Sequence, residues 1–159
     1  MSGNKNSTFK LSHTSDYPTR CYIGGLFGWI PGGTYRTIRT EITLTNNTNF
    51  RFEISAPEHS DVNIGGIVGY MEGGAACPID ATSSGNSMTG SITAPEDNVN
   101  IGRLIGKRYR YSSSSLLWNG TDLKAATVGT VLDNSGWTIK DFTGATWDIG
   151  GASSTTTTG

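Results

Sequence analysis

The chain has 159 residues, with 12 basic and 13 acidic side chains and a formal net charge of −1. This length predicts a single domain that can bury a core. The balanced charge does not favour nucleic-acid binding, which needs a basic surface. No run approaches the roughly 20 apolar residues that cross a bilayer, so no membrane insertion is expected. Glycine is abundant, at 22 residues. Ser, Thr and Asn are also frequent, and this composition predicts an all-β fold because these residues favour strands and turns over helices.

An internal repeat organises the predicted domain, which spans residues 1–159. Segment 54–69 matches segment 92–106 with one residue deleted in the loop. Weaker matches flank this pair, and the expected copies lie at roughly 9–33, 50–74, 88–111 and 137–151, followed by a polar tail at 152–159. The shared core of the copies is an Ile-Gly strand at Ile23, Ile64, Ile101 and Ile149.

Each copy is predicted to begin with a short strand. In the second copy Phe52, Ile54 and Ala56 alternate with polar residues, which is the period of a half-buried strand. The proline that follows ends this strand because it donates no ladder hydrogen bond. A polar loop of about ten residues then leads to the glycine-rich strand.

The glycine-rich strand is predicted to be a packing element. Cys21 aligns with valine in the next two copies, so we interpret it as a small buried hydrophobe rather than a reactive thiol. The paired glycines permit a bulge or a close approach by a neighbouring backbone. Two apolar residues follow them in each copy, at 26–27, 67–68 and 104–105, which predicts a strand covered on both faces.

Residues 112–135 are the least repetitive part of the chain. Here the short apolar strand 116–118 precedes Asn119-Gly120, a strong hairpin-turn signal.

The string 64–74, Ile-Gly-Gly-Ile-Val-Gly-Tyr-Met-Glu-Gly-Gly, resembles the glycine-rich GLUG repeat of large bacterial surface proteins. Residues 21–33 are similar. The resemblance covers about a third of the chain and implies a parallel β-solenoid with an adhesive or matrix role. The third copy departs from the pattern, because Arg103 replaces the second glycine and Lys107 replaces the aromatic residue present at Trp29 and Tyr70.

The fold expected from these patterns is a repetitive β-solenoid or β-helix-like domain. Repeats near 40 residues also suit a small β-propeller with four-stranded blades. A β-prism, in which each unit is a small antiparallel sheet, is a further alternative. The simple apolar-glycine repeats favour the solenoid, in which each unit packs only against its neighbours.

The sequence gives little support for catalysis. The two histidines, His13 and His59, lie far apart in polar loops, and neither has partners at the spacing of a catalytic or zinc site. We therefore expect no enzyme activity and no cofactor. Carboxylates recur in the loop before the glycine-rich strand and form a weak candidate calcium site, since carboxylate oxygens bind calcium; they are Glu58, Asp61, Glu96 and Asp97.

Two groups of side chains are candidates for binding. Aromatic rings near loops or strand ends can stack on sugars with little loss of entropy, and the candidates are Tyr35, Tyr109, Tyr111 and Trp118. Trp29 and Tyr70 hold equivalent repeat positions and are expected in a core or in a stack between repeats. A basic group around the third copy is a candidate contact for an acidic glycan or another subunit; it comprises Arg103, Lys107, Arg108 and Arg110.

The function expected from the sequence is a non-catalytic structural or adhesive protein, outside the cell or on its surface, that self-associates or joins other subunits. One alternative is a lectin-like carbohydrate-binding module. Another is a structural component of a virion or phage tail.

Overall fold

The computed structural model describes residues 1–12, 21–31, 39–56, 62–73, 78–94, 99–110, 115–123 and 129–150. These ranges form strands and turns without a helix, so the predicted all-β class is confirmed. In the same ranges no helix exists that could span a membrane. The strands in chain order are β1 (Thr8–Ser12), β2 (Cys21–Gly24), β3 (Phe27–Ile30), β4 (Thr40–Thr45), β5 (Phe50–Ser55), β6 (Val62–Gly65), β7 (Val68–Gly73), β8 (Ile79–Ser84), β9 (Asn86–Thr93), β10 (Val99–Gly102), β11 (Ile105–Arg110), β12 (Leu116–Trp118), β13 (Thr121–Asp122) and β14 (Trp137–Thr143).

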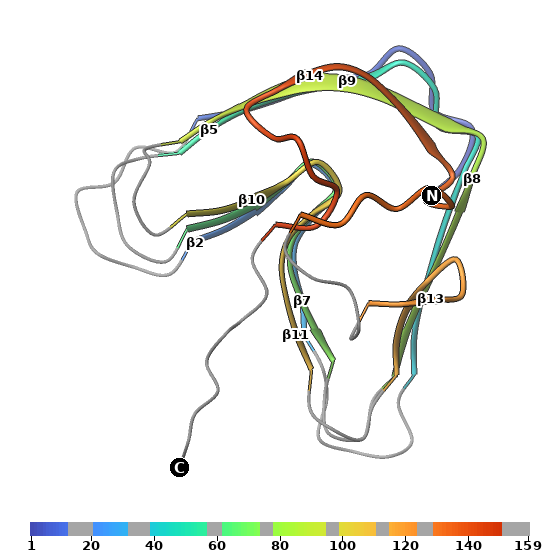
Figure 1. Cartoon of the computed structure of the whole chain (residues 1–159). Coiled ribbons are helices and arrows are strands. Elements are labelled where there is room, and N and C mark those ends of the chain that lie inside the picture. The colour runs from blue at the N-terminus through green and yellow to red at the C-terminus, as the bar shows by residue number, and fades with distance from the viewer. Residues whose placement is uncertain are drawn as a thin grey trace.

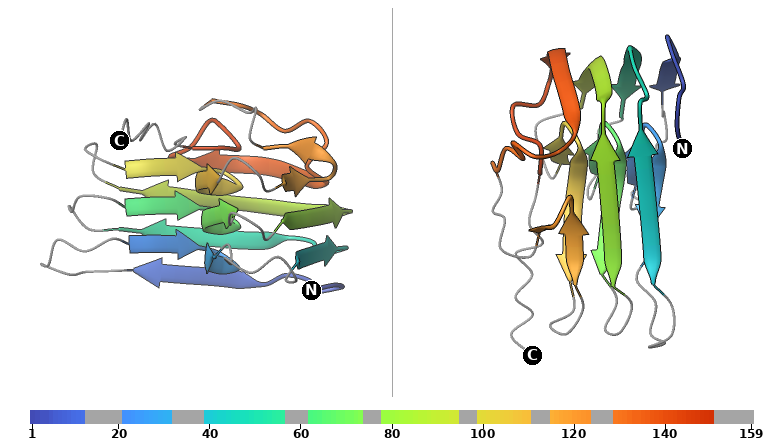
Figure 2. Two further views of the ribbon diagram at one scale, coloured as in Figure 1. Left: turned by 90° about the horizontal axis from the view of Figure 1, so that it is seen from below. Right: turned by 90° about the vertical axis from the view of Figure 1, so that its right-hand side faces the viewer.

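The described strands form four open sheets, each named here after its best-paired central strand (Figure 1). The β5 sheet has the order β1-β5-β9-β14, the β6 sheet β10-β6-β2, the β7 sheet β11-β7-β3 and the β8 sheet β13-β12-β8-β4. Neighbouring strands are parallel except for the β12–β13 hairpin. In Figure 2 corresponding strands of successive chain segments lie side by side.

The segments that the sequence alignment equates are paired in the structure. In the β6 sheet Ile23 lies opposite Ile64, and Ile64 lies opposite Ile101. In the β5 sheet Ile54 lies opposite Ile92. The register is therefore the one that the two best-matching segments predict. The alternation predicted for Phe50–Ser55 is also observed, with Phe52 and Ile54 buried.

The predicted glycine-rich strand is divided into two strands by a corner. β6 ends at Gly65 and β7 begins at Val68, and the two strands belong to different sheets. Glycines allow these sheets to meet closely: a Cβ added at Gly69 would lie 2.5 Å from the backbone nitrogen of Ile23, and one at Gly106 would lie 2.6 Å from the Ile64 backbone. The glycines thus form a corner between two sheets, where the sequence had suggested a bulge or a close backbone approach.

Two apolar clusters lie between the sheets. The larger one is enclosed by the β5, β7 and β8 sheets and includes Phe52, Met71 and Trp118. The smaller one lies between the β5 and β6 sheets and includes Ile54 and Ile64. Ile67 and Val68 are both buried at the corner, which confirms that the doubly apolar step is covered on both faces.

The fourth copy is displaced from its predicted alignment. Ile149 bridges to Ile105 in the β7 sheet, whereas the sequence alignment equated it with Ile101 in the β6 sheet. In β14, Ile139 lies opposite Met88, and a bulge before Phe142 includes Asp141 at φ 47°. This bulge adds one residue to β14, whereas Ile149 bridges a residue four positions beyond Ile101, so the bulge alone does not account for the displacement.

Candidate functional site

Several predicted site residues lie outside the described ranges. These are the aromatic candidates Tyr35 and Tyr111, the calcium candidates Glu58, Asp61, Glu96 and Asp97, and the histidines His13 and His59; the side chain of Arg110 is likewise not described. Their predicted roles stay predictions.

The structure corrects the prediction of an accessible ring at Trp118. The side chain is 1% exposed and belongs to the larger apolar cluster. Its Nε1 donates hydrogen bonds to Ser83 Oγ at 3.0 Å and to the carbonyl oxygen of Ser135 at 3.1 Å. The turn at Asn119-Gly120 folds β13 back onto β12, and the apolar strand before it faces the core. Trp118 therefore presents no ring face on which a sugar could stack.

The predicted basic group does not form one surface. Lys107 lies opposite Tyr70, while Arg108 lies opposite the buried Met71 and is itself 7% exposed. Adjacent residues in a strand point to opposite faces, so Lys107 and Arg108 face different sides of the β7 sheet.

Arg103 has a structural contact instead. Its Nε lies 2.8 Å from Asp148 Oδ1, and Asp148, 3% exposed, also accepts a hydrogen bond at 2.7 Å from the backbone nitrogen of Leu132. The residue that breaks the glycine pattern thus ties the third copy to segment 129–150.

Replacing Asp148 with Asn should lower the free energy of unfolding by about 2 kcal/mol, because it removes a charge-assisted bond to a partly buried guanidinium. Glu41→Gln is the matched control, since Glu41 pairs with Arg39 at the surface, where both side chains are more than half exposed. That change should cost less than about 1 kcal/mol. Urea denaturation of both variants measures the difference. Equal effects would contradict a stabilising role for the Asp148 contact.

Three aromatic rings gather on the outer side of the corner between the β6 and β7 sheets. Tyr22 and Tyr70 are stacked, with ring centroids 4.8 Å apart and an interplanar angle of 23°. Trp29 lies 5.9 Å from Tyr22 and is 50% exposed. Trp29 and Tyr70 were expected in a core or a stack; the observed arrangement is a surface group, in which Tyr70 stacks on Tyr22 and Trp29 is its most exposed member.

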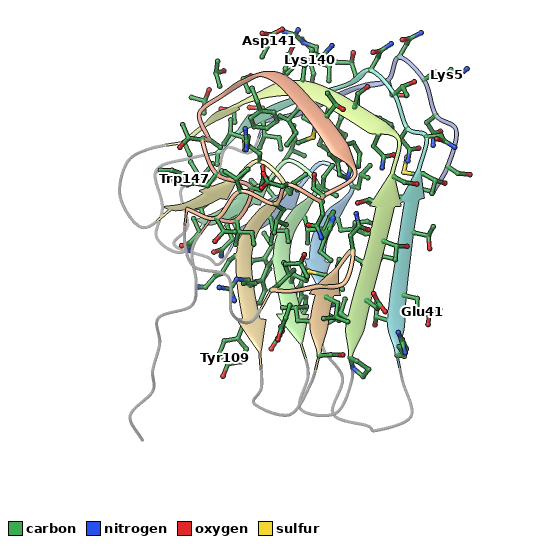
Figure 3. The ribbon with its side chains drawn as sticks, turned by 45° about the vertical axis from the view of Figure 1, so that its right-hand side comes forward. Lys5, Glu41, Tyr109, Lys140, Asp141 and Trp147 are labelled. Carbon is green, nitrogen blue, oxygen red and sulfur yellow. The ribbon has the colours of Figure 1, made fainter. Side chains whose placement is uncertain are left out.

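Polar side chains continue this face along the β7 sheet. Trp29 Nε1 donates a hydrogen bond to Glu72 Oε2 at 3.1 Å. Lys107 Nζ lies 6.0 Å from the Tyr70 ring centroid. Tyr109, an aromatic candidate from the sequence, lies opposite Glu72 and projects outward at the end of β11 (Figure 3). We call Tyr22, Trp29, Tyr70, Glu72 and Lys107 the aromatic face.

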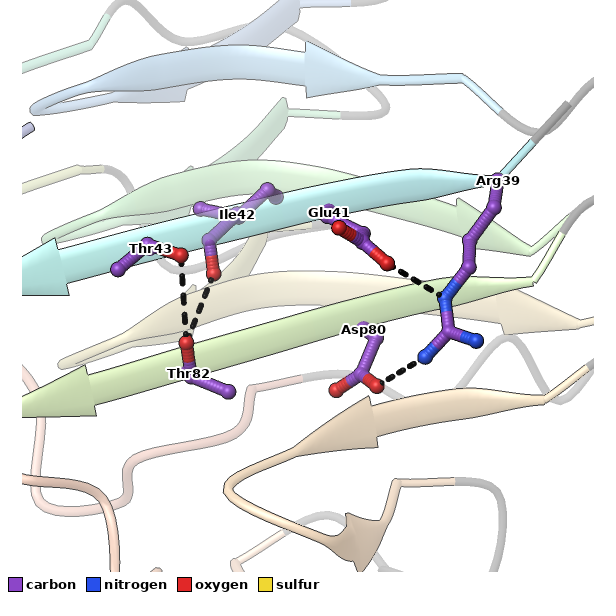
Figure 4. Close-up of polar contacts among 6 residues, drawn as sticks. All are labelled: Arg39, Glu41, Ile42, Thr43, Asp80 and Thr82. Atoms are coloured by element: carbon purple, nitrogen blue, oxygen red, sulfur yellow. Dashed lines mark hydrogen bonds and ion pairs between the residues drawn. The ribbon is translucent and has the colours of Figure 1, made fainter.

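Successive chain segments lie side by side and form a stack of strands (Figure 2). The N-terminal end of this stack, formed by β1, β2, β3 and β4, is open. β1, β2, β3 and β4 are the edge strands of their sheets, and among the described residues only 1–7 lie beside this end, along residues 43–51. A pocket of 360 Å³ opens here between β3 and β4, lined by apolar side chains that include Phe27, Trp29 and Ile42 and by polar residues of β4 such as Glu41. On the outer surface of β4, Arg39 lies between Glu41 and Asp80 (Figure 4).

The opposite end is covered in part within the described ranges, and β10, β11 and β14 are edge strands there. The β13 hairpin pairs with β12, and residues 147–150 hydrogen-bond to Arg103, Leu104 and Ile105 at the starts of the last strands. β14, which contains the bulge, is the last strand of the β5 sheet at this end. The two ends of the stack therefore differ in the backbone edges that they present.

A ladder of asparagines was missed by the sequence analysis. Asn4 Nδ2 donates to Asn47 Oδ1 at 2.9 Å, and Asn47 Nδ2 donates to Asn86 Oδ1 at 3.0 Å. Asn86 Nδ2 donates in turn to the carbonyl oxygen of Leu44 at 2.9 Å. Asn47 and Asn86 are buried. Their recurrence two residues after β4 and β8 is the signal that could have predicted this ladder.

Two titratable groups are perturbed by their surroundings. A hydrogen bond from Lys10, and then one from Arg51, hold the pKa of Glu53 below its usual value. A carboxyl whose folded-state pKa is lowered stabilises the fold above its unfolded pKa, and this contribution is lost as the pH falls through the folded value. Burial raises the pKa of the Cys21 thiol. This agrees with the interpretation of Cys21, which packs against the smaller cluster.

The described part of the chain contains no group of three or more His, Cys, Asp and Glu side chains arranged to hold a metal ion. Comparison of the chain with protein-family models, curated proteins and solved structures found no match.

Proposed function

We propose that the chain is a short β-solenoid with a structural or adhesive role, and that it acts by association with a second copy of itself through its open N-terminal end. Each turn of such a solenoid would contribute one strand to each of the four sheets. The resemblance to GLUG repeats of bacterial surface proteins supports a location outside the cell or on its surface. The proposal assigns the chain no catalytic step.

The contrast between the two ends is the observation that carries the proposal. Parallel edge strands present unpaired N–H and C=O groups that can pair with another chain. Four edge strands, β1 to β4, lie at one end of the stack next to a pocket, and residues 1–3 pair with only part of β4 there. Repeat proteins normally cover their terminal units, as the β13 hairpin and segment 129–150 do at the other end.

A second copy suits this face because an association through the same surface on both partners is the commonest arrangement in homodimers. The exposed charges beside β4 include both signs, at Arg39 and Glu41, so two copies related by a twofold axis can match opposite charges. A head-to-tail contact is disfavoured, since at the other end β13 occupies the edge of β12 and residues 148–150 pair with the start of β11.

The test uses a proline in edge strand β4. The backbone nitrogen of Thr40 donates a hydrogen bond to the carbonyl oxygen of Pro78, toward β8. The backbone nitrogen of Thr45 donates to the carbonyl oxygen of Met1, on the side of β4 that faces away from β8. By alternation, the Thr43 N–H also points to the open side. Thr43→Pro removes this donor and leaves the β4–β8 ladder intact. Thr43→Ala is the matched control, because it keeps the N–H and loses the same hydroxyl.

We expect the wild type and Thr43→Ala to be dimers by light scattering at micromolar concentration. The dissociation constant of the Thr43→Pro dimer should be at least about tenfold higher. Electron microscopy of the wild type should show paired particles. A wild-type chain that is monomeric at these concentrations would overturn the proposed association.

The carbohydrate-binding alternative is favoured by one observation, the aromatic face. Of its candidate residues from the sequence, Trp118 is buried, Tyr109 lies opposite Glu72 beside the aromatic face, and Tyr35 and Tyr111 lie outside the described ranges and stay predictions.

A further inference from the structure

We propose that the aromatic face binds a neutral polysaccharide, with Trp29 and Tyr70 as the stacking rings. The site adjoins the open end, because Tyr22 and Trp29 belong to edge strands β2 and β3 and Trp29 also lines the pocket there; it uses their side chains and not the backbone edges. It consists of side chains on the outer face of the β6–β7 corner.

The rings are held in place before any ligand binds. Trp29 is 50% exposed, and its indole is tied by Nε1 to Glu72 Oε2 at 3.1 Å. Tyr70 stacks on Tyr22 at 4.8 Å. Contiguous exposed apolar groups, unlike single exposed residues, mark binding sites, and the three rings here are contiguous. Side chains that are already ordered lose little entropy when a ligand binds.

The chemistry of the face matches a pyranose ring. A sugar presents an apolar C–H face and a rim of hydroxyl groups. The Trp29 ring offers apolar area for the C–H face. The Glu72 carboxylate next to it can accept hydrogen bonds from hydroxyls, and the Lys107 ammonium can donate to them. The carboxylate and the ammonium carry opposite charges, so the face has no net charge, which favours a neutral sugar over an acidic one.

The arrangement also suits a chain of sugars rather than a single one. Trp29, Tyr70 and Lys107 occupy one row across the β7 sheet, each opposite the next. Neighbouring strands are about 4.8 Å apart, a spacing similar to the length of one hexose unit in an extended polysaccharide. A polysaccharide that runs along the stack would meet one side chain of this row at each step.

Affinity electrophoresis in native gels that contain hydroxyethyl cellulose, starch, dextran or alginate tests the proposal. We expect the wild type to be retarded by at least one of the three neutral polymers and not more strongly by the anionic alginate. Trp29→Ala and Tyr70→Ala should weaken the retardation at least about tenfold, as expected for the removal of a central aromatic contact.

Trp147→Ala is the matched control. Trp147 is 47% exposed and lies in segment 129–150 at the other end of the stack, so its loss removes an equally exposed indole and should leave the retardation unchanged. Circular dichroism and the melting temperature show that each variant is folded. Thr43→Pro should also bind normally, which separates this proposal from the self-association.

Three results would overturn the proposal. The first is an absence of retardation in all four polymers. The second is retardation of folded Trp29→Ala equal to that of the wild type. The third is binding to alginate alone.

Discussion

Gly69→Ala should keep the chain from folding or lower its free energy of unfolding by about 3 kcal/mol or more. The added Cβ would lie 2.5 Å from the backbone nitrogen of Ile23 and 2.6 Å from the carbonyl oxygen of Gly28. Both neighbours are backbone atoms in paired strands, so they cannot move aside as a flexible side chain could. The corner between the β6 and β7 sheets would have to open. Urea denaturation followed by circular dichroism measures the loss.

Gly120→Ala is the control for this substitution. Gly120 has φ +76°, and a Cβ there would have no heavy atom within 4 Å. Its cost comes from the left-handed backbone alone, about 1 kcal/mol. If Gly69→Ala were no worse than Gly120→Ala, the close approach of the two sheets at this corner would be wrong.

Trp118→Ala should lower the free energy of unfolding by about 3–5 kcal/mol, as large-to-small changes of core aromatic residues do. The change empties a site in the larger cluster and leaves the carbonyl oxygen of Ser135 without its indole donor. For a domain of this size the melting temperature should fall by about 10 °C.

The exposed Trp147 gives the comparison for this result, since Trp147→Ala should change stability by less than about 0.5 kcal/mol. Equal losses for the two tryptophans would contradict the buried position of Trp118. Any loss of glycan binding in Trp118→Ala would report unfolding, so Trp29 is the informative position for binding experiments.

The core strands were predictable because local pattern and tertiary contact agree. Phe52 and Ile54 alternate with polar neighbours, and they pack inward as this period requires. The match between segments 54–69 and 92–106 gave the correct register because the one residue that differs in number lies in the loop and not within a paired strand.

The wrong predictions arose where the sequence pattern does not show where the chain turns or which side of a strand faces the core. The glycines after Ile64 were interpreted as part of one strand, since a corner and a bulge both require residues without a Cβ. Trp118 was assigned to the surface because it precedes a turn, although alternation in a three-residue strand cannot show which side faces the core. Ile149 was misaligned because the two-residue Ile-Gly match is too short to fix the register: Ile149 bridges Ile105, four residues beyond Ile101, and the one-residue bulge in β14 does not account for that shift.

The aromatic face could be predicted only in part. Trp29 and Tyr70 were recognised as equivalent positions, and their pairing across β3 and β7 agrees with that. Tyr22 comes from another sheet, and it meets Tyr70 only because the corner brings the two sheets together. No regular spacing in the sequence predicts such a contact between side chains of two different sheets.

The difference between the two ends gives the stack a polarity that limits how far it can grow. A subunit with two equivalent open ends would add further subunits without a limit and form filaments. At one end the edge strands are β1, β2, β3 and β4, of which β4 pairs in part with residues 1–3, and at the other end they are β10, β11, β14 and the two-residue β13, which occupies the edge of β12. Two copies that meet at the open end use up the site of addition in both. In the proposed association the assembly is therefore a closed pair of fixed size.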